Sequence, residues 1–335
     1  MAANYWESTQ RKHWLFTKEE LAAMRQKLED EDPGLVQMFT LPQPRHLNIY
    51  FNQQINRLGK RLGVRQQAMA TAQVYIKRFY SKVEIRRTNP YLVLTTAVYL
   101  ACKMEECPQH IRMVVQEARQ LWAADFHSLE TSKLGECEFF LISEMHSQLI
   151  VHQPYRTLTS LQSDFSLSQD ELALAWSVIN DHYMTDLPLL YPPHTIALTA
   201  VLLALVLRPP SGQNSQASAA AAIGSASSMG GMANAASFLA QAQVHASQGS
   251  QTPGGAGSQQ QQAGGGANGK EKATDARLNK VQRFAVWLAE SNVDIEAMVD
   301  CTQELIAFYE CHEQYNDKLT REQIIRFVKA RGLDK

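Results

Sequence analysis

Residues 89–106, NPYLVLTTAVYLACKMEE, decide the fold of this chain. Asn89 can cap the first free N–H groups of a helix, and Pro90 suits its first position. Apolar residues then occupy every side of the predicted helix, which is typical of a helix surrounded by others. At about 1.5 Å per residue the stretch is roughly 26 Å long, short for a membrane span. Its end carries three charges, Lys103, Glu105 and Glu106.

The composition indicates an intracellular protein of about two domains for 335 residues. A net charge of −1 gives no attraction of the whole protein to nucleic acid or anionic membranes. Residues 1–16 lack the apolar core of a signal peptide. The five cysteines are odd in number and form no CxxC pair, so we expect reduced thiols and neither a disulfide framework nor a zinc site.

Helical periodicity runs through the first half of the chain. A capping box of Thr17 and Glu20 predicts an N-terminal helix, and a proline-containing linker follows it. Five helices are expected next, at 46–62, 65–82, the central stretch, 111–123 and 128–150. In the last of these we expect an inward face of Phe139, Phe140, Ile142 and Met145. Strand signals are sparse, so the predicted fold class is all-α.

A second set of helices is expected after Pro154. Its members are 155–165, 168–186, 193–208, 277–290 and 294–313, followed by a closing helix at 321–331. The third member is again the most apolar and again follows prolines, which suggests an internal repeat. Residues 209–273 interrupt this set with an Ala/Ser/Gly/Gln-rich insertion that we expect to be disordered. The predicted parts are an N-terminal arm and helix (1–45), a first unit (46–152), a second unit (153–314) and a C-terminal helix (315–335).

Signs of catalysis are weak. The sequence has no glycine-rich phosphate loop and no HExxH or GxSxG motif. Asp181 and His182 suggest a metal site, but no second cluster of ligands has matching spacing. Cys102 and Cys137 lie in apolar helices, where we expect core thiols and not nucleophiles. An all-α enzyme would need a clustered polar pocket, and the sequence shows none.

Two basic runs are interpreted as solvated surface and not as a nucleic-acid site. In the run Lys77-Arg78-Phe79, helical spacing is expected to turn Phe79 inward and the two charges outward. The doublet Arg86-Arg87 is expected in a loop.

The charged end of the central helix is the remaining candidate for function. Lys103 would be held rigidly where a buried helix emerges, and the fifth helix offers Glu136 and Glu138. If the two helices pack side by side, Lys103 and one of these glutamates share a surface. One interpretation is an ordinary surface ion pair worth about 0–1 kcal/mol. The other is a rigid scaffold that presents fixed donors and acceptors to the backbone of another protein.

The sequence resembles the cyclin family. LACKMEE (100–106) resembles the cyclin-box motif L-A-x-K-x-E-E, while YIKRFY and ECEFF fall where that family places its other motifs. LIVHQPYR (149–156) and DLPLLYPP (186–193) resemble the C-type cyclins, the subgroup that serves the kinase module of Mediator. The resemblance covers nearly everything outside the insertion, and it implies two tandem five-helix cyclin boxes.

The resemblance also implies the function of a non-catalytic activator without a cofactor. Such a cyclin has as partners a cyclin-dependent kinase of the Mediator kinase module and the other subunits of that module, in the nucleus, and it binds no nucleic acid or membrane directly. Lys103 and Glu138 match the pair that contacts kinase backbone, Glu106 belongs to the same motif, and Glu136 is the competing assignment. An alternative is a cyclin-fold general transcription factor of the B type that binds promoter DNA, which would need an N-terminal zinc ribbon and a basic face. The aromatic N-terminal arm is expected to pack on the boxes, with partner binding as the alternative.

Overall fold

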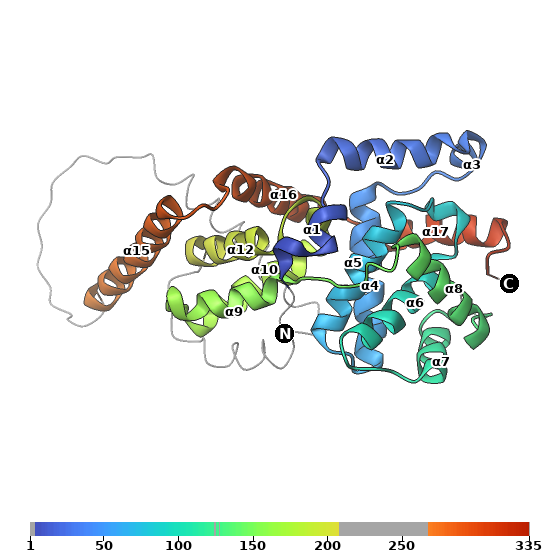
Figure 1. Cartoon of the computed structure of the whole chain (residues 1–335), viewed down its shortest axis with the longest axis horizontal. Coiled ribbons are helices and arrows are strands. Elements are labelled where there is room, and N and C mark those ends of the chain that lie inside the picture. Colours follow the sequence, from blue (N-terminus) through green and yellow to red (C-terminus); the bar gives the residue numbers. More distant parts are fainter. Residues whose placement is uncertain (1–3, 124, 127, 208–266, 335) are drawn as a thin grey trace, which may run out of the picture. The chain divides into compact units, whose positions relative to one another are not determined.

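The computed structural model describes residues 4–123, 125–126, 128–207 and 267–334. All regular structure in these residues is helical, so the predicted all-α fold class is confirmed. Two short 3₁₀ turns cover Tyr5–Glu7 and Ile85–Arg87. The α-helices in Figure 1 are α1 (Thr9–His13), α2 (Lys18–Asp30), α3 (Pro33–Met38), α4 (Pro44–Arg61), α5 (Gln66–Tyr80), α6 (Pro90–Met104), α7 (Ile111–Leu121), α8 (Thr131–Glu144), α9 (Pro154–Asp164), α10 (Gln169–His182), α11 (Leu187–Leu190), α12 (Pro193–Leu207), α15 (Ala267–Glu290), α16 (Ile295–Glu313) and α17 (Asp317–Ala330).

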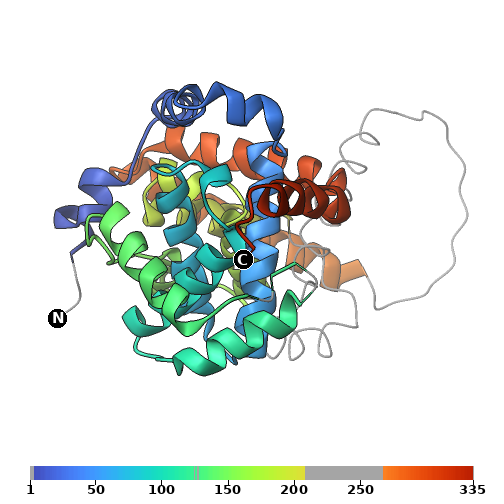
Figure 2. The same cartoon turned by 90° about the vertical axis from the view of Figure 1, so that its right-hand side faces the viewer.

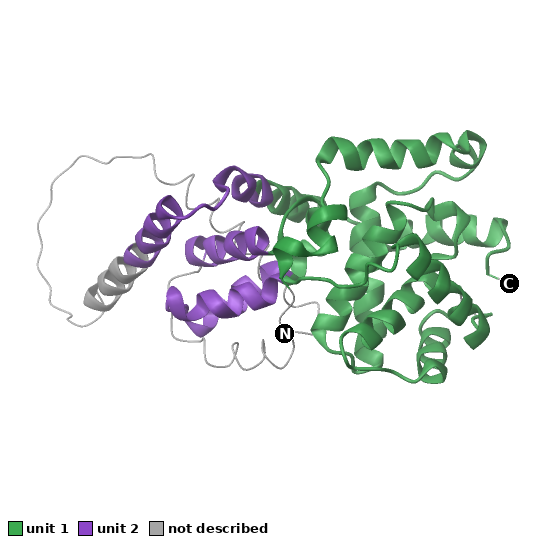
Figure 3. Ribbon diagram, in the orientation of Figure 1, with its two compact units in different colours: residues 1–153, 180–193, 303–335 green, residues 154–179, 194–302 purple. Residues whose placement is uncertain are grey.

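The chain forms two compact units, which Figure 3 shows in different colours. Unit 1 comprises residues 1–153, 180–193 and 303–335, and unit 2 comprises residues 154–179 and 194–302. Each unit therefore combines separate parts of the sequence. The domain boundaries given above stay predictions.

Helix α6 is the centre of unit 1, as predicted. The Asn89 side chain accepts hydrogen bonds from the backbone N–H groups of Tyr91 and Leu92, and Pro90 is the first helical residue. The helix packs against α4, α5, α7 and α8. These contacts explain why a helix of this kind has no polar stripe: each of its sides faces another helix.

The C-terminal helix also belongs to unit 1. Helix α17, dark red in Figure 2, packs against α4. It buries Ile324, Phe327 and Val328 completely. Arg321 of α17 also forms an ion pair with the buried Asp125 (Nη2–Oδ2 2.6 Å). The residues after α16 are thus part of the core of unit 1 rather than a peripheral appendage.

Several helix boundaries differ from the predicted ones. Helix α4 begins at Pro44, inside the predicted linker, because proline suits the first turn of a helix as well as a loop. Helix α8 is shorter than predicted, and α17 begins at Asp317, four residues before the predicted 321. The predicted insertion lies outside the described residues from 209 to 266. Its last part, 267–273, is helical and not disordered as predicted, because α15 begins at Ala267.

The predicted inward face of α8 is wrong for the two phenylalanines. Phe139 is 76% exposed and Phe140 is 41% exposed, whereas Met145 is fully buried as predicted. Ile142 is half-buried. The face that enters the core consists of Leu134, Cys137, Leu141 and Met145. These positions recur every three to four residues, and this spacing selects the buried face of a helix irrespective of side-chain size.

The prediction of solvated charges is wrong for three basic residues, because Lys77, Arg78 and Arg86 are all buried. Each finds an oxygen outside its own helix: Lys77 Nζ donates to Asn48 Oδ1 (2.8 Å), Arg78 Nη1 to Gln148 O (2.8 Å) and Arg86 Nε to Phe39 O (2.7 Å). Arg86 also pairs with the buried Glu84. A buried cation is tolerated when such partners replace water, and no local pattern reveals them.

Unit 2 is built around a second helix that is apolar on all sides, α12. Its residues Ile196, Ala200, Val201 and Ala204 are buried. A capping box begins α10: Ser168 N donates to Glu171 Oε2 (2.7 Å), and Glu171 N donates back to Ser168 Oγ (3.3 Å). Between α9 and α15, the Phe165 ring lies 5.0 Å from that of Phe284.

Candidate functional site

Two charged side chains from α6 and α8 form an ion pair at the surface of unit 1. Lys103 Nζ contacts Glu138 Oε1. The ammonium group also lies 4.7 Å from the centre of the Tyr99 ring, one helical turn earlier on α6. The Lys103 side chain is 39% exposed and the Glu138 side chain 14% exposed. The ammonium is therefore held by a carboxylate and an aromatic face, while part of it stays open to a partner.

The position of Glu138 follows from the packing of α8. Glu138 lies four residues after Leu134 and three before Leu141, and both leucines are fully buried. Residues at these spacings share one face of a helix, so the carboxylate is directed toward α6. Glu136 is exposed, as is Glu106, and neither is ion-paired with Lys103 in the described part of the chain. Of the two glutamates left open by the sequence, the structure brings Glu138 to Lys103.

The backbone turns sharply directly after Lys103. Glu106 adopts a left-handed conformation (φ 53°), and Cys107 N donates to Cys102 O (2.9 Å), which closes the end of α6. Glu105 is directed into the unit, where its Oε1 accepts a hydrogen bond from Thr71 Oγ1 (2.6 Å). The three charged residues at the end of α6 are thus separated by the turn. Glu105 is hydrogen-bonded inside the unit, whereas Lys103 and Glu106 are exposed at the surface.

Large exposed apolar side chains accompany the ion pair on the same elements. Met104 follows Lys103 and is 40% exposed, Phe139 follows Glu138, and Ile150, in the segment after α8, is 55% exposed. We call Lys103, Glu138, Met104 and Phe139 the α6–α8 surface. Exposed apolar side chains gathered around polar groups mark interaction sites more often than scattered single ones do. Sequence reasoning missed this surface because it placed Phe139 in the core.

The segment after α8 is fixed by residues distant in sequence. His146 and Ser147 both have positive φ values, 52° and 57°. The next residue, Gln148, accepts hydrogen bonds on its backbone oxygen from Arg78 and on its Oε1 from Trp14 Nε1 (2.7 Å). The Arg78 guanidinium stacks 5.1 Å from the Trp14 ring, and burial lowers the pKa of Arg78 to about 10. The N-terminal arm therefore packs on unit 1 through Trp14, as expected for part of it, while Trp6 is 54% exposed.

The cysteines and the Asp181–His182 pair considered in the sequence for catalysis or metal binding are all buried. Burial raises the pKa of Cys102 to about 12 and that of Cys137 to about 11, so both thiols stay protonated. Asp181 is buried, and its Oδ2 accepts a hydrogen bond from Tyr309 OH (3.0 Å). Within the described residues, no three His, Cys, Asp or Glu side chains are grouped as a metal site would require. None of the described helices has the length and apolarity needed to cross a membrane.

Comparison with known proteins gives the family. Residues 19–150 match the family described as "Cyclin, N-terminal domain". Over the full length of both chains, the protein is 66% identical to an RNA polymerase II holoenzyme cyclin-like subunit of Chaetomium globosum and 66% identical to one of Neurospora crassa. The chain belongs to the cyclin family. The resemblance to the C-type cyclins, seen in the sequence, is confirmed by these relatives, and they do not favour the alternative of a B-type general transcription factor.

Solved structures agree with a cyclin fold. A chain in the structure of the CAK complex from Chaetomium thermophilum bound to ATP-gamma-S aligns with a TM-score of 0.58 at 18% identity, covering 100% of this cyclin and 91% of that chain. A chain of the yeast TFIIK complex (Kin28/Ccl1/Tfb3) aligns with a TM-score of 0.50 at 17% identity, covering 72% of this cyclin and 99% of that chain. At such low identity these likenesses concern the fold alone.

Proposed function

We propose that this cyclin is a non-catalytic regulatory subunit that binds and activates a cyclin-dependent kinase of the Mediator kinase module. In this role it acts in the nucleus on RNA polymerase II transcription, together with the other subunits of that module. Family membership and the names of the full-length relatives support the proposal. Within the structure, the observation that carries it is the preformed Lys103–Glu138 pair on the α6–α8 surface.

The pair is suited to contact the backbone of a partner helix. A lysine ammonium has three N–H donors, and Glu138 occupies one of them. The remaining donors can reach a backbone carbonyl, while the second Glu138 oxygen can accept from a backbone N–H. Each such contact to a charged group contributes about 1.5–3 kcal/mol. Because the two side chains already hold each other in place, little further side-chain entropy is lost on binding.

Activation requires more than this pair. In active kinases a lysine and a glutamate form an ion pair that positions the ATP phosphates, and the glutamate-bearing helix must be held inward. A shift from 1:99 to 99:1 in favour of that state needs about 5.5 kcal/mol of differential binding. Two charge-assisted contacts scarcely reach this value, so the exposed apolar side chains Phe139 and Met104 are expected to supply the remainder.

The test is co-purification and a kinase assay with the Mediator-type kinase. The variants are Lys103→Ala, Glu138→Ala and the double mutant, with Glu136→Ala as the matched control on the same helix. We expect the double mutant to lose binding and activation, and Glu136→Ala to behave like the wild type. Full binding and activity in the double mutant would reduce the pair to an ordinary surface ion pair. Loss in Glu136→Ala alone would mean that the other glutamate makes the kinase contact.

A further inference from the structure

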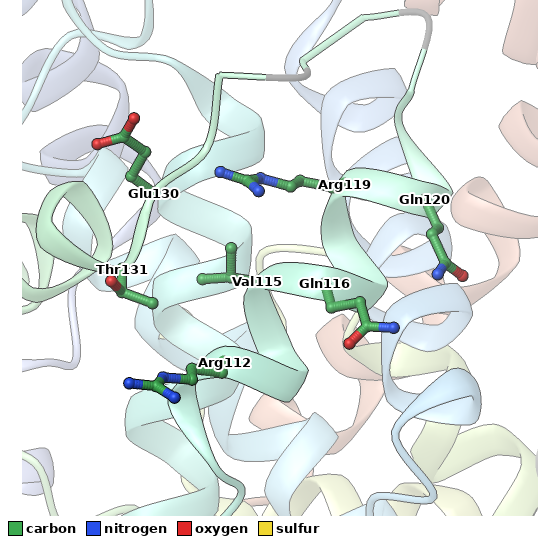
Figure 4. Close-up of a pocket in the computed structure, with 7 residues that line it drawn as sticks. All are labelled: Arg112, Val115, Gln116, Arg119, Gln120, Glu130 and Thr131. Atoms are coloured by element: carbon green, nitrogen blue, oxygen red, sulfur yellow. The ribbon is translucent and has the colours of Figure 1, made fainter.

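A second polar feature of unit 1 lies between α7 and the start of α8 (Figure 4). It is an open pocket of about 600 Å³. Arg112 and Arg119 come from α7, Glu130 and Thr131 come from the beginning of α8, and Figure 4 shows the Arg119 guanidinium directed across the pocket toward Glu130. None of these residues belongs to the α6–α8 surface, so the function proposed above assigns them no role.

The two arginines present unused hydrogen-bond donors on one face of α7. They are seven residues apart, which places them two helical turns apart on the same side. Arg119 Nε donates to Leu129 O (2.5 Å), which fixes the side chain and leaves both terminal NH₂ groups available. The Arg112 guanidinium makes no hydrogen bond or ion pair with any residue that the structure describes. Neither arginine is ion-paired with Glu130 within that part of the chain.

Gln120 also lines the pocket but is tied to α4. Its Oε1 accepts a hydrogen bond from Arg61 Nη2 (2.5 Å), and Arg61 is itself paired with Glu117 (2.7 Å). Figure 4 shows the Gln120 side chain directed away from Arg119 and Glu130, so the donors beside Glu130 are those of the arginines. The pocket thus offers two guanidinium groups against the single carboxylate of Glu130. A site so rich in donors is suited to an anion.

We propose that this pocket binds a phosphorylated side chain of a protein partner. A phosphoserine or phosphothreonine carries a charge of about −1.5 to −2 and three acceptor oxygens, which match the forked donors of arginine. The volume is larger than a phosphate ion needs, so the neighbours of the phosphorylated residue also enter. Glu130 then selects a basic residue next to the phosphate and disfavours a purely acidic peptide or an RNA backbone.

The test measures binding of phosphopeptides to the full-length chain, alone and bound to its kinase. The probes are a degenerate phosphoserine peptide library with a fixed neighbouring lysine, its unphosphorylated form, inorganic phosphate and a single-stranded RNA. Fluorescence anisotropy of the selected peptides follows. The variants are Arg112→Glu and Arg119→Glu, with Arg326→Glu, an exposed arginine of α17, as the matched control. Arg112→Glu is decisive because its side chain holds no other residue in place.

We expect phosphate-dependent binding that Arg112→Glu weakens at least about tenfold and that Arg326→Glu leaves unchanged. Equal binding by Arg112→Glu and the wild type would overturn the proposal, as would no phosphate-dependent binding at about 1 mM peptide. Equal or tighter binding of RNA would also overturn it and would indicate a general polyanion surface. Unchanged kinase activation by Arg112→Glu is expected in every case, which separates this result from the test of the α6–α8 surface.

Discussion

Phe139 allows the apolar part of the α6–α8 surface to be tested separately from its charges. The side chain is 76% exposed, and on kinase binding we expect most of that area to be removed from water. Full burial of a phenylalanine contributes roughly 1.5–3 kcal/mol, and three quarters of that is about 1–2 kcal/mol. Phe139→Ala is therefore expected to weaken kinase binding by roughly 5- to 30-fold. The stability of the free cyclin is expected to change by less than about 0.5 kcal/mol, because the side chain packs little before binding.

The assay is titration of the kinase with wild-type and variant cyclin, with thermal unfolding of each free cyclin measured in parallel. Leu319→Ala, at a 55% exposed position on α17, is the matched control and is expected to bind like the wild type. Phe140→Ala provides a contrast, since the Phe140 ring packs edge-on against the buried Phe79 at 5.2 Å. That variant is expected to lower the unfolding temperature as well. Equal affinity of Phe139→Ala and the wild type would refute the assignment of this surface.

Three further predictions concern the stability of the fold. Phe327→Ala is expected to lower the free energy of unfolding by about 3–5 kcal/mol, because a completely buried ring in α17 is replaced by a cavity. Chemical denaturation would measure this loss. A loss under about 1 kcal/mol would show that α17 contributes little to the core. Gly63→Ala is expected to lower the free energy of unfolding by about 1–2 kcal/mol. Gly63 has a φ of 64°, a conformation in which a residue with a Cβ is strained, although no atom lies close enough to clash with that Cβ. An unchanged midpoint of chemical denaturation would contradict this prediction. Burial raises the pKa of Asp181 from 3.8 to about 7, only partly opposed by the Tyr309 hydrogen bond, so the folded state binds more protons than the unfolded one between these values. Asp181 therefore contributes its full stabilisation below about pH 4, and this contribution falls as the pH rises toward 7. In the Asp181→Asn variant we expect a smaller fall and a higher unfolding temperature at pH 8. Thermal unfolding measured at a series of pH values would test this.

The sequence by itself determined the features that depend on neighbouring residues. The cap at Asn89 and the capping box at Thr17 are both present as predicted. Each involves atoms at most four residues apart, so the local chain contains all the interacting groups. The burial of α6 was also determined in this way, because a helix without a polar face has no side that it can leave in water. Family membership followed from motifs on these same helices.

Only the tertiary structure decided which polar groups are buried and which apolar groups are exposed. Arg78 was expected in solvent, and its acceptor, Gln148 O, lies 70 residues away. Phe139 was expected in the core but is exposed, and the residues of α8 that are buried there include Leu134 and Leu141. Glu136 and Glu138 are indistinguishable by residue type, and only the packing of α8 on α6 brings Glu138 to Lys103. In each case the buried and the exposed placement of the side chain differ in their contacts with a segment distant in sequence. The pattern of neighbouring residues carries no information on the free energy of those contacts.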